Sequence, residues 1–104
     1  MNALQRIIGA EGVILIPDDT PITMPAGKSA YALLIRIDGT EVSAVDYVLS
    51  EGTFAVSTTG ESWQGVSLQR GDLVTFEYPV TAITLGASGD SAFAYIESSN
   101  YLIP

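Results

Sequence analysis

Two apolar stretches meet at an aspartate and a glycine in residues 30–49, whose sequence is AYALLIRIDGTEVSAVDYVL. The first stretch, residues 30–37, is apolar at almost every position, which predicts a central strand buried on both faces. Asp38-Gly39 is the strongest short hairpin signal in the chain. Residues 42–49 are then the predicted return strand of this hairpin.

Short apolar segments continue on both sides of residues 30–49, separated by clusters of Gly, Pro, Asp and Ser. Proline donates no backbone hydrogen bond, so Pro17 and Pro79 are expected to end or interrupt strands. With the two strands above, the count reaches seven or eight, which predicts an all-β fold, a small antiparallel β-sandwich or barrel. The further predicted strands are residues 12–16, 53–57, 62–69, 73–78, 80–85 and 91–97.

No linker divides the 104 residues, so residues 1–104 are predicted to form a single β domain. Residues 1–10 are a predicted N-terminal arm, in which residues 2–9 have the spacing of a short helix but also fit an edge strand. Residues 99–104 are a predicted apolar C-terminal tail. Residues 17–28 hold three prolines and are expected to form a long loop.

The charge balance is strongly acidic, with 12 acidic residues against 4 basic ones and a formal net charge of −8. Affinity for nucleic acid and for anionic membranes depends on clustered Lys and Arg, so neither partner is expected. The chain has no signal-peptide pattern and no apolar run long enough to cross a bilayer. These features favour a protein that is made in a cytoplasm.

Catalytic chemistry has little support in the sequence. Nucleophilic catalysis needs a base beside the nucleophile, and the chain has neither His nor Cys. A Ser–Lys dyad with Lys28 is formally possible, and a calcium site at Asp18-Asp19 is a remote alternative. Aspartates in loops usually bond their own backbone, as expected also for Asp38 beside Glu41. We therefore predict no enzyme activity, no cofactor and no metal site.

Two further features have both a structural and a functional interpretation. Arg70-Gly71-Asp72 spells the tripeptide that some cell-adhesion receptors bind, but the same residues favour a turn between strands, which we expect here. Trp63 is the only tryptophan. It either fills the core or stacks against a partner, and the sequence leaves both open.

Apolar residues are concentrated at both ends of the chain, where residues are usually polar unless something holds them. These end residues either dock on their own domain or contact a neighbouring molecule, as large apolar patches often do. We take the second interpretation as a hypothesis. The predicted partner-binding residues are Leu4, Ile7, Ile8, Trp63, Tyr101, Leu102 and Ile103.

The second half carries a series of short motifs that together are similar to one family. They are Trp63, Val66 and Leu68, then Gly71-Asp72, Tyr78-Pro79, Ile83-Thr84-Leu85, Ser88-Gly89 and Ala94-Tyr95-Ile96. Residues 63–96 thereby resemble the small accessory head proteins of tailed bacteriophages, which are decoration, cement or head-fibre proteins. Residues 79–85 come near the loose pattern P-x-T-x-I-T-L of such chains. The resemblance implies a virion protein that forms a homo-oligomer, most often a trimer, and binds the major capsid protein or another virion protein.

Two functions follow from these observations. The first is a non-enzymatic structural or assembly protein of a phage-like virion, such as a capsid decoration or cement protein. It would be made in the host cytoplasm and located in the virion. The alternative is a carbohydrate- or peptide-binding β module, with Trp63, Tyr47 and Tyr31 as contacts. Titration with sugars distinguishes the two, because the fluorescence of Trp63 responds only where its ring stacks on the ligand.

Overall fold

The computed structural model describes residues 12–49, 52–56 and 62–98, and these residues form strands and loops without a helix. The prediction of an all-β fold is confirmed. The predicted N-terminal arm and C-terminal tail lie outside the described residues. The strands are β1 (Gly12–Ile16), β2 (Ile22–Thr23), β3 (Lys28–Ile35), β4 (Val42–Leu49), β5 (Gly52–Val56), β6 (Leu73–Leu85) and β7 (Ala92–Ser98).

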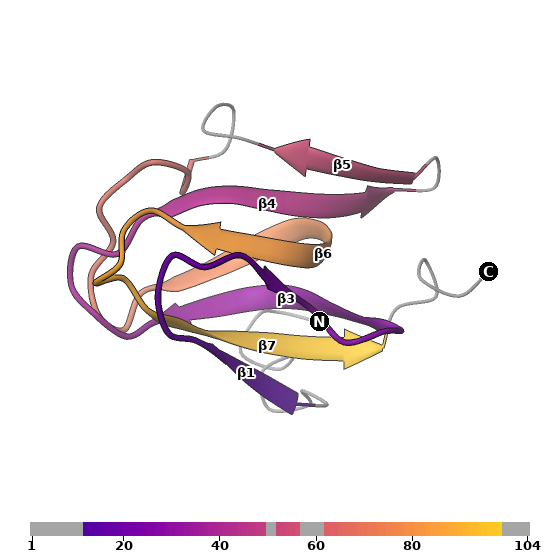
Figure 1. The fold of residues 1–104 in the computed structure, drawn as a ribbon, viewed down its shortest axis with the longest axis horizontal. Coiled ribbons are helices and arrows are strands. Elements are labelled where there is room, and N and C mark those ends of the chain that lie inside the picture. The colour runs from indigo at the N-terminus through magenta and orange to yellow at the C-terminus, as the bar shows by residue number, and fades with distance from the viewer. Residues whose placement is uncertain (1–11, 50–51, 57–61, 99–104) are drawn as a thin grey trace.

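Six strands follow one another in the order β1-β7-β3-β6-β4-β5, and every pair is antiparallel. The sheet curls into a nearly closed barrel, and Figure 1 shows the series running from β5 at the top to β1 at the bottom. The two-residue β2 pairs with β6 beside this path. The predicted count of seven or eight strands is therefore too high, since six strands build the path.

The barrel has two layers, one formed by β1, β7, β3 and the first half of β6, and the other by the second half of β6, β4 and β5. The strand β6 therefore belongs to both layers. Its first half pairs with β3 through Leu73–Thr75, its second half pairs with β4 through Val80–Leu85, and Val80 also pairs with Ala30 of β3. Figure 1 shows β6 turning back, so that both of its ends lie at the left of the molecule. Pro79 was expected to interrupt a strand, and this prediction is wrong. Residue 79 is not a paired position: it lies in the irregular stretch of β6 between Thr75, opposite Ala32, and Val80, opposite Ala30, where no paired residue requires its missing N–H.

The prediction of a β-hairpin at Asp38-Gly39 is also wrong. β3 and β4 do not pair with each other, because β6 lies between them in the sheet. The aspartate and glycine do form a turn, in which Gly39 has a φ of +87° and its N–H bonds the Leu68 carbonyl at 2.7 Å. Local turn chemistry was thus correctly predicted, whereas the pairing partner was decided by residues far along the chain.

Residues 62–69 were predicted to be a strand, and the structure instead shows a folded segment with two isolated bridges. Gln64 pairs in parallel with Val42, and Leu68 pairs antiparallel with Thr40. The chain must reverse between these bridges, and Gly65, with a φ of +68°, lies in the reversal. This segment contacts the start of β4 and adds no strand to the sheet.

The core lies between the layers and contains the inward residues of each strand. In β3, Leu33 and Ile35 are buried opposite Ala94 and Ala92 of β7. A register shift between Ala30 and Ala32 allows residues on both sides of it to remain buried. Among the described residues the largest fully buried side chains are Ile16, Leu33, Ile35, Ile83, Leu85, Val42, Val45, Val80, Thr40, Ser29 and Ser91.

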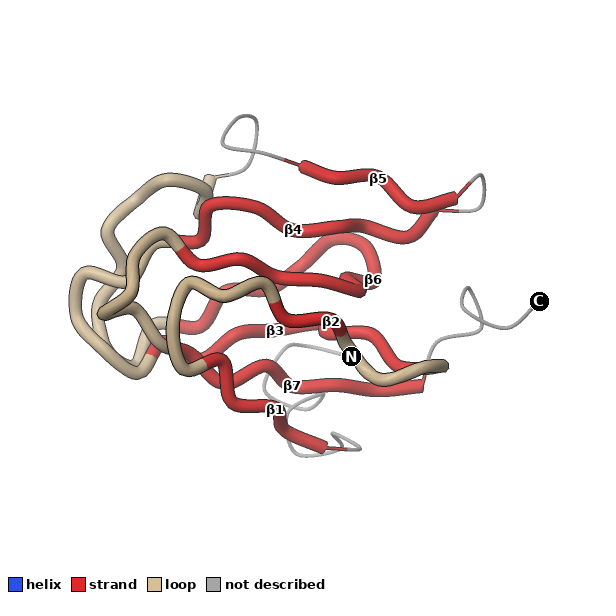
Figure 2. The backbone as a smooth tube through the Cα atoms, in the orientation of Figure 1, coloured by secondary structure: helices blue, strands red, loops and turns tan. Residues whose placement is uncertain are grey.

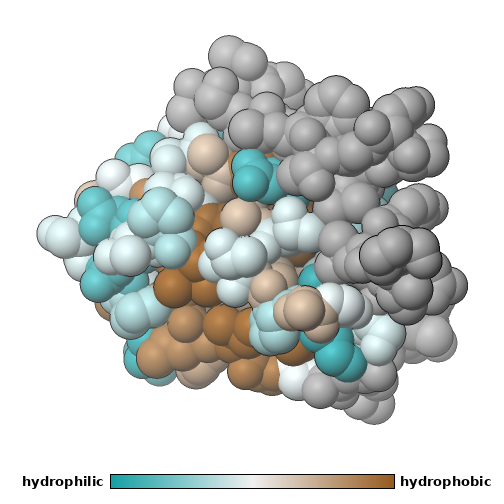
Figure 3. Space-filling view, turned by 45° about the vertical axis from the view of Figure 1, so that its right-hand side comes forward, coloured by the Kyte–Doolittle hydropathy of each residue, from teal (hydrophilic) through white to brown (hydrophobic). Residues whose placement is uncertain are grey.

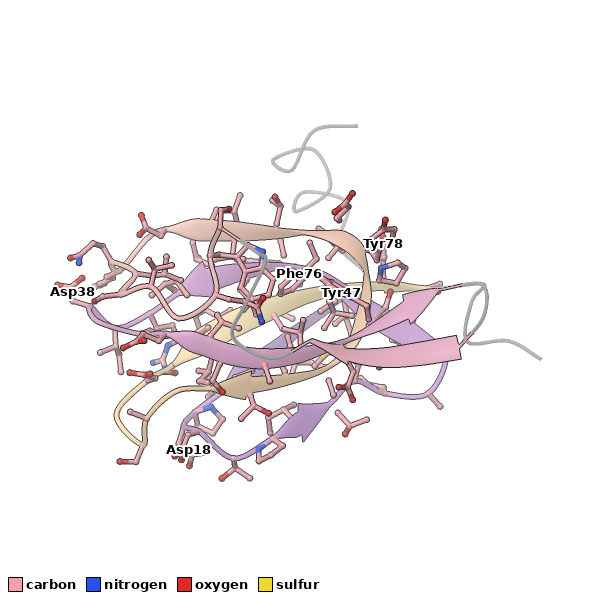
Figure 4. All side chains as sticks on the ribbon, turned by 90° about the horizontal axis from the view of Figure 1, so that it is seen from above. Asp18, Asp38, Tyr47, Phe76 and Tyr78 are labelled. Atoms are coloured by element: carbon pink, nitrogen blue, oxygen red, sulfur yellow. The ribbon has the colours of Figure 1, made fainter. Side chains whose placement is uncertain are left out.

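Aromatic rings fill the interior beside β6. The ring of Phe76 lies edge-on to Trp63, with centroids 5.4 Å apart, and to Tyr47, at 6.5 Å. Tyr47 in turn contacts the ring of Tyr78, at 5.6 Å, and Tyr78 is 43% exposed at the surface. Figure 4 shows Tyr47 and Phe76 inside the molecule, viewed from above. These contacts link the segment before β6 to β4 and complete the core.

Two adjacent leucines of β3 provide a direct test of the layer assignment. Leu33 is fully buried in the core, whereas Leu34 is only half-buried on the opposite side of the strand. Leu33→Ala is expected to lower the free energy of unfolding by about 2–5 kcal/mol, because it leaves a cavity. Leu34→Ala, the matched control, is expected to cost about 1 kcal/mol. Urea unfolding measures both, and equal losses would contradict the assignment.

Candidate functional site

An apolar surface covers the outward side of the four-strand layer formed by β1, β7, β3 and the first half of β6. Strand register places its residues in two rows. The first row is Leu15, Phe93, Leu34 and Leu73, and the second is Val13, Tyr95, Ala32 and Thr75. We call this surface the outer apolar face. Because side chains alternate along a strand, these rows lie on the side opposite the core residues Ile16, Leu33 and Val74. Ala32, beside the register shift of β3, is fully buried.

The outer apolar face is partly open to solvent. Val13 is 53% exposed, Leu15 46% and Leu73 40%, while Leu34, Phe93 and Tyr95 are half-buried. Figure 3 shows apolar residues gathered along the lower part of the molecule, the part in which Figure 1 places β1. The two rows contain no charged residue. Contiguous apolar surface of this kind is typical of contact sites between proteins.

The loops gather at one end of the barrel, at the left of Figure 2. There a buried serine, Ser91, holds several segments together. Its Oγ donates to the Ile16 carbonyl at 2.8 Å, and its N–H donates to Thr40 Oγ1 at 3.2 Å. The same Oγ accepts a hydrogen bond from Arg36 Nη1 at 2.8 Å. Arg36 also lies over the Phe93 ring, with the guanidinium carbon 5.1 Å from its centroid.

A second arginine stands beside Arg36 on the turn before β6. The Arg70 N–H donates to Asp38 Oδ1 at 2.7 Å, and the Gly71 N–H donates to the Ile35 carbonyl at 2.9 Å. Ile35, Arg36, Arg70, Gly71 and Phe93 line a hollow of about 410 Å³. The prediction that residues 70–72 form a turn is confirmed by the bond from the Asp72 N–H to the Gln69 carbonyl at 2.9 Å.

The structure places Trp63 in the core, with 9% of its surface exposed. Its ring is occupied by packing within the chain, and we do not include it in a contact surface. Tyr31 and Tyr47, proposed with it as ligand contacts, are 2% and 4% exposed. The remaining predicted partner-binding residues lie outside the described residues. They are Leu4, Ile7, Ile8, Tyr101, Leu102 and Ile103.

The residues considered for catalysis or metal binding have structural roles or lie at the surface. Lys28 Nζ donates to Ser98 Oγ at 3.1 Å, but the pair lies at the protein surface, whereas catalytic lysines work from desolvated positions. Within residues 12–49, 52–56 and 62–98 there is no group of three or more His, Cys, Asp or Glu suited to a metal ion. No helix long and apolar enough to cross a membrane occurs in those ranges either.

Asp18 shows the backbone bonding expected of a loop aspartate. Its Oδ1 accepts the Thr20 N–H at 2.8 Å. This bond, with a second from the Thr20 side chain, lowers the pKa of the Asp18 carboxyl below its usual value. The turn therefore keeps the bond at neutral pH and loses it as the pH falls through the lowered pKa. Asp38 similarly accepts a backbone N–H, so neither aspartate needs a ligand to explain it.

The sequence did not identify the outer apolar face. Residues 13–16 are all apolar, and the sequence does not show which side of this strand faces the core. The alternation of residues 92–96 puts Phe93 and Tyr95 on one side of β7 without showing whether that side is buried. Register with β1 and β3 was needed to join them to Val13, Leu15 and Leu34.

Replacing Ser91 tests the role of the loop end. Ser91→Ala removes the hydrogen bonds of the buried Oγ to Ile16 and Arg36, and is expected to lower the free energy of unfolding by about 1–3 kcal/mol. Ser88→Ala, on the exposed part of the same loop, is the matched control and is expected to change it by under about 0.5 kcal/mol. Thermal and urea unfolding measure both. Equal stability of the two variants would exclude this role for Ser91.

Comparison of the chain with family models, with curated proteins and with solved structures found no match in any of the three.

Proposed function

We propose that this chain is a non-enzymatic structural protein of a phage-like virion, such as a capsid decoration or cement protein. The observation that carries the proposal is the outer apolar face, which leaves Val13, Leu15 and Leu73 between 40% and 53% exposed on a small acidic domain. The phage-like setting rests on the resemblance of residues 63–96 to accessory head proteins. The major capsid protein or another virion protein is the further partner that this resemblance implies.

The first occupant proposed for the outer apolar face is another copy of this chain. Each copy carries a formal net charge of −8, so two copies repel one another over most of their surfaces. Electrostatic repulsion between two copies is therefore weakest where they meet through a surface without acidic residues. The two rows of the face meet this condition, and Phe93 and Tyr95 add aromatic rings of the kind that dominate contact energies.

The alternative function, a carbohydrate- or peptide-binding β module, loses its supporting residues. Trp63, Tyr47 and Tyr31 are all at least nine-tenths buried, and a ring that stacks on a sugar has to be exposed. We therefore do not propose this alternative.

Light scattering after size-exclusion chromatography tests the assembly. The unaltered chain is expected to form oligomers, with a trimer implied by the resemblance. Leu15→Glu and Leu73→Glu place a carboxylate in the apolar rows and should weaken self-association by about tenfold or more.

Val66→Glu is the matched control, because Val66 is 43% exposed but lies outside the two rows. It should leave the oligomeric mass unchanged. Circular dichroism should show the same β-rich spectrum for all variants. A chain that stays monomeric at high concentration and also fails to bind any phage-like shell would overturn the proposal.

A further inference from the structure

Two of the four basic residues of this acidic chain line one small hollow. The chain contains 12 acidic residues and only 4 basic ones, yet Arg36 and Arg70 both border the hollow of about 410 Å³ at the loop end. They are 34 positions apart in sequence, and the fold brings them together. Phe93 of the outer apolar face completes the lining.

Arg36 is held in place before any ligand arrives. Its Nη1 donates to Ser91 Oγ at 2.8 Å, and its backbone N–H donates to the Ser91 carbonyl at 3.0 Å. Ser91 is only 1% exposed and is itself anchored to Ile16 and Thr40. The guanidinium lies over the Phe93 ring, which further limits its rotation. An arginine fixed in this way loses little conformational entropy when it binds an anion.

Arg70 is carried by a turn with several internal bonds. Asp72 Oδ2 accepts the Gln69 N–H at 2.8 Å, and the Asp72 N–H donates to the Gln69 carbonyl at 2.9 Å. Gly71 has a φ of +91°, a conformation that other residues rarely adopt, and open space surrounds the position of a Cβ there. The turn therefore fixes the backbone of Arg70 while its side chain remains exposed.

The nearby carboxylates are already used by backbone amides. Asp38 bonds the Arg70 N–H, Asp72 bonds the Gln69 N–H, and Asp90 bonds the N–H groups of Glu41 and Ala87. In the part of the chain that the structure describes, neither guanidinium forms an ion pair with a carboxylate. Most of the N–H groups of the two guanidinium groups, those of Arg36 and Arg70, therefore remain available to a ligand.

We propose that the Arg36–Arg70 hollow binds a carboxylate, supplied by an aspartate or glutamate side chain of a partner protein. The planar forks of two arginines match the two oxygens of a carboxylate, and such charge-assisted bonds are stronger than neutral ones. The carboxylates of Asp38 and Asp72 lower the positive potential near the hollow. Hydrogen bonds from the guanidinium N–H groups, more than net charge, therefore hold the ligand. The Phe93 ring accommodates the methylene groups that carry the carboxylate. Only the identity of the carrier rests on the proposed function.

Titration of the isotope-labelled chain with sodium acetate tests the hollow by nuclear magnetic resonance. The amide signal of Gly71 is expected to shift and saturate, whereas Gly27, in the loop between β2 and β3, serves as the reference and should not move. Sodium chloride at the same ionic strength should give no saturable shift. Arg36→Gln and Arg70→Gln should each weaken acetate binding by about tenfold or more.

Lys28→Gln removes one positive charge away from the hollow and should leave acetate binding unchanged. The unfolding midpoint of each variant shows whether it is folded, and Arg70→Gln is informative even if Arg36→Gln is destabilised, because Arg70 is exposed. The carboxylate site is overturned if acetate causes no saturable shift, if both arginine variants bind like the unaltered chain, or if inorganic phosphate binds more tightly than acetate.

Capped peptides identify the carrier. A peptide that contains a single glutamate should bind the hollow more tightly than acetate, and its glutamine counterpart should not bind. Binding of acetate without the glutamate peptide would overturn a protein carrier. The outcome is separable from that of the proposed function. Acetate binding by a monomeric Leu15→Glu variant would support the hollow even if assembly failed, and loss of acetate binding in an oligomeric chain would overturn the hollow alone.

Discussion

Hydrogen bonding along β6 holds the two layers of the barrel together, because this one strand pairs with β3 in its first half and with β4 in its second. The reversal within β6 brings both of its ends to the same side of the molecule. The turn that carries Arg70 leads into one end, and the loop that carries Asp90 follows the other. The loop end, the outer apolar face and the core thus all depend on how this strand bends.

Sequence patterns predicted strands well where a strand is recognisable from its own residues. Gly12–Ile16 and Val42–Leu49 have the predicted bounds, because apolar runs between Pro, Gly and Asp specify both element and ends. Errors arose where distant pairing decides the outcome. Asp38-Gly39 turns as expected, but β6 inserts between the flanking strands. Pro79 is accommodated because its position has no ladder partner, a fact that only the register reveals.

The candidate site was largely beyond prediction for the same reason. Arg36 and Arg70 are unremarkable in sequence, and only the contact of the β3–β4 and β6 turns places them on one hollow. Burial also decided the aromatic residues. Trp63 carried no sign of whether it faced solvent, since tryptophan suits both a core and a contact surface. The structure assigns it to the core beside Phe76 and places Phe93 and Tyr95 on the outer apolar face.

The two surfaces meet at Phe93, which belongs to the outer apolar face and also lines the hollow. A partner bound across this junction would bury apolar area and satisfy charged groups together. Such a combination separates the sources of affinity and specificity, since apolar burial adds affinity and directed polar bonds select orientation.

The pairing of β1 with β7 has a consequence for how the chain acquires its structure during translation. Gly12 lies opposite Ile96, so the two strands are separated by most of the chain. Within the described residues β1 has no other strand partner. It therefore cannot pair in the sheet until residues 92–98 have left the ribosome. Contacts of such long sequence separation slow folding and prolong the exposure of apolar strands. Ile16, which is fully buried in the folded chain, therefore stays exposed on the nascent chain until β7 is available.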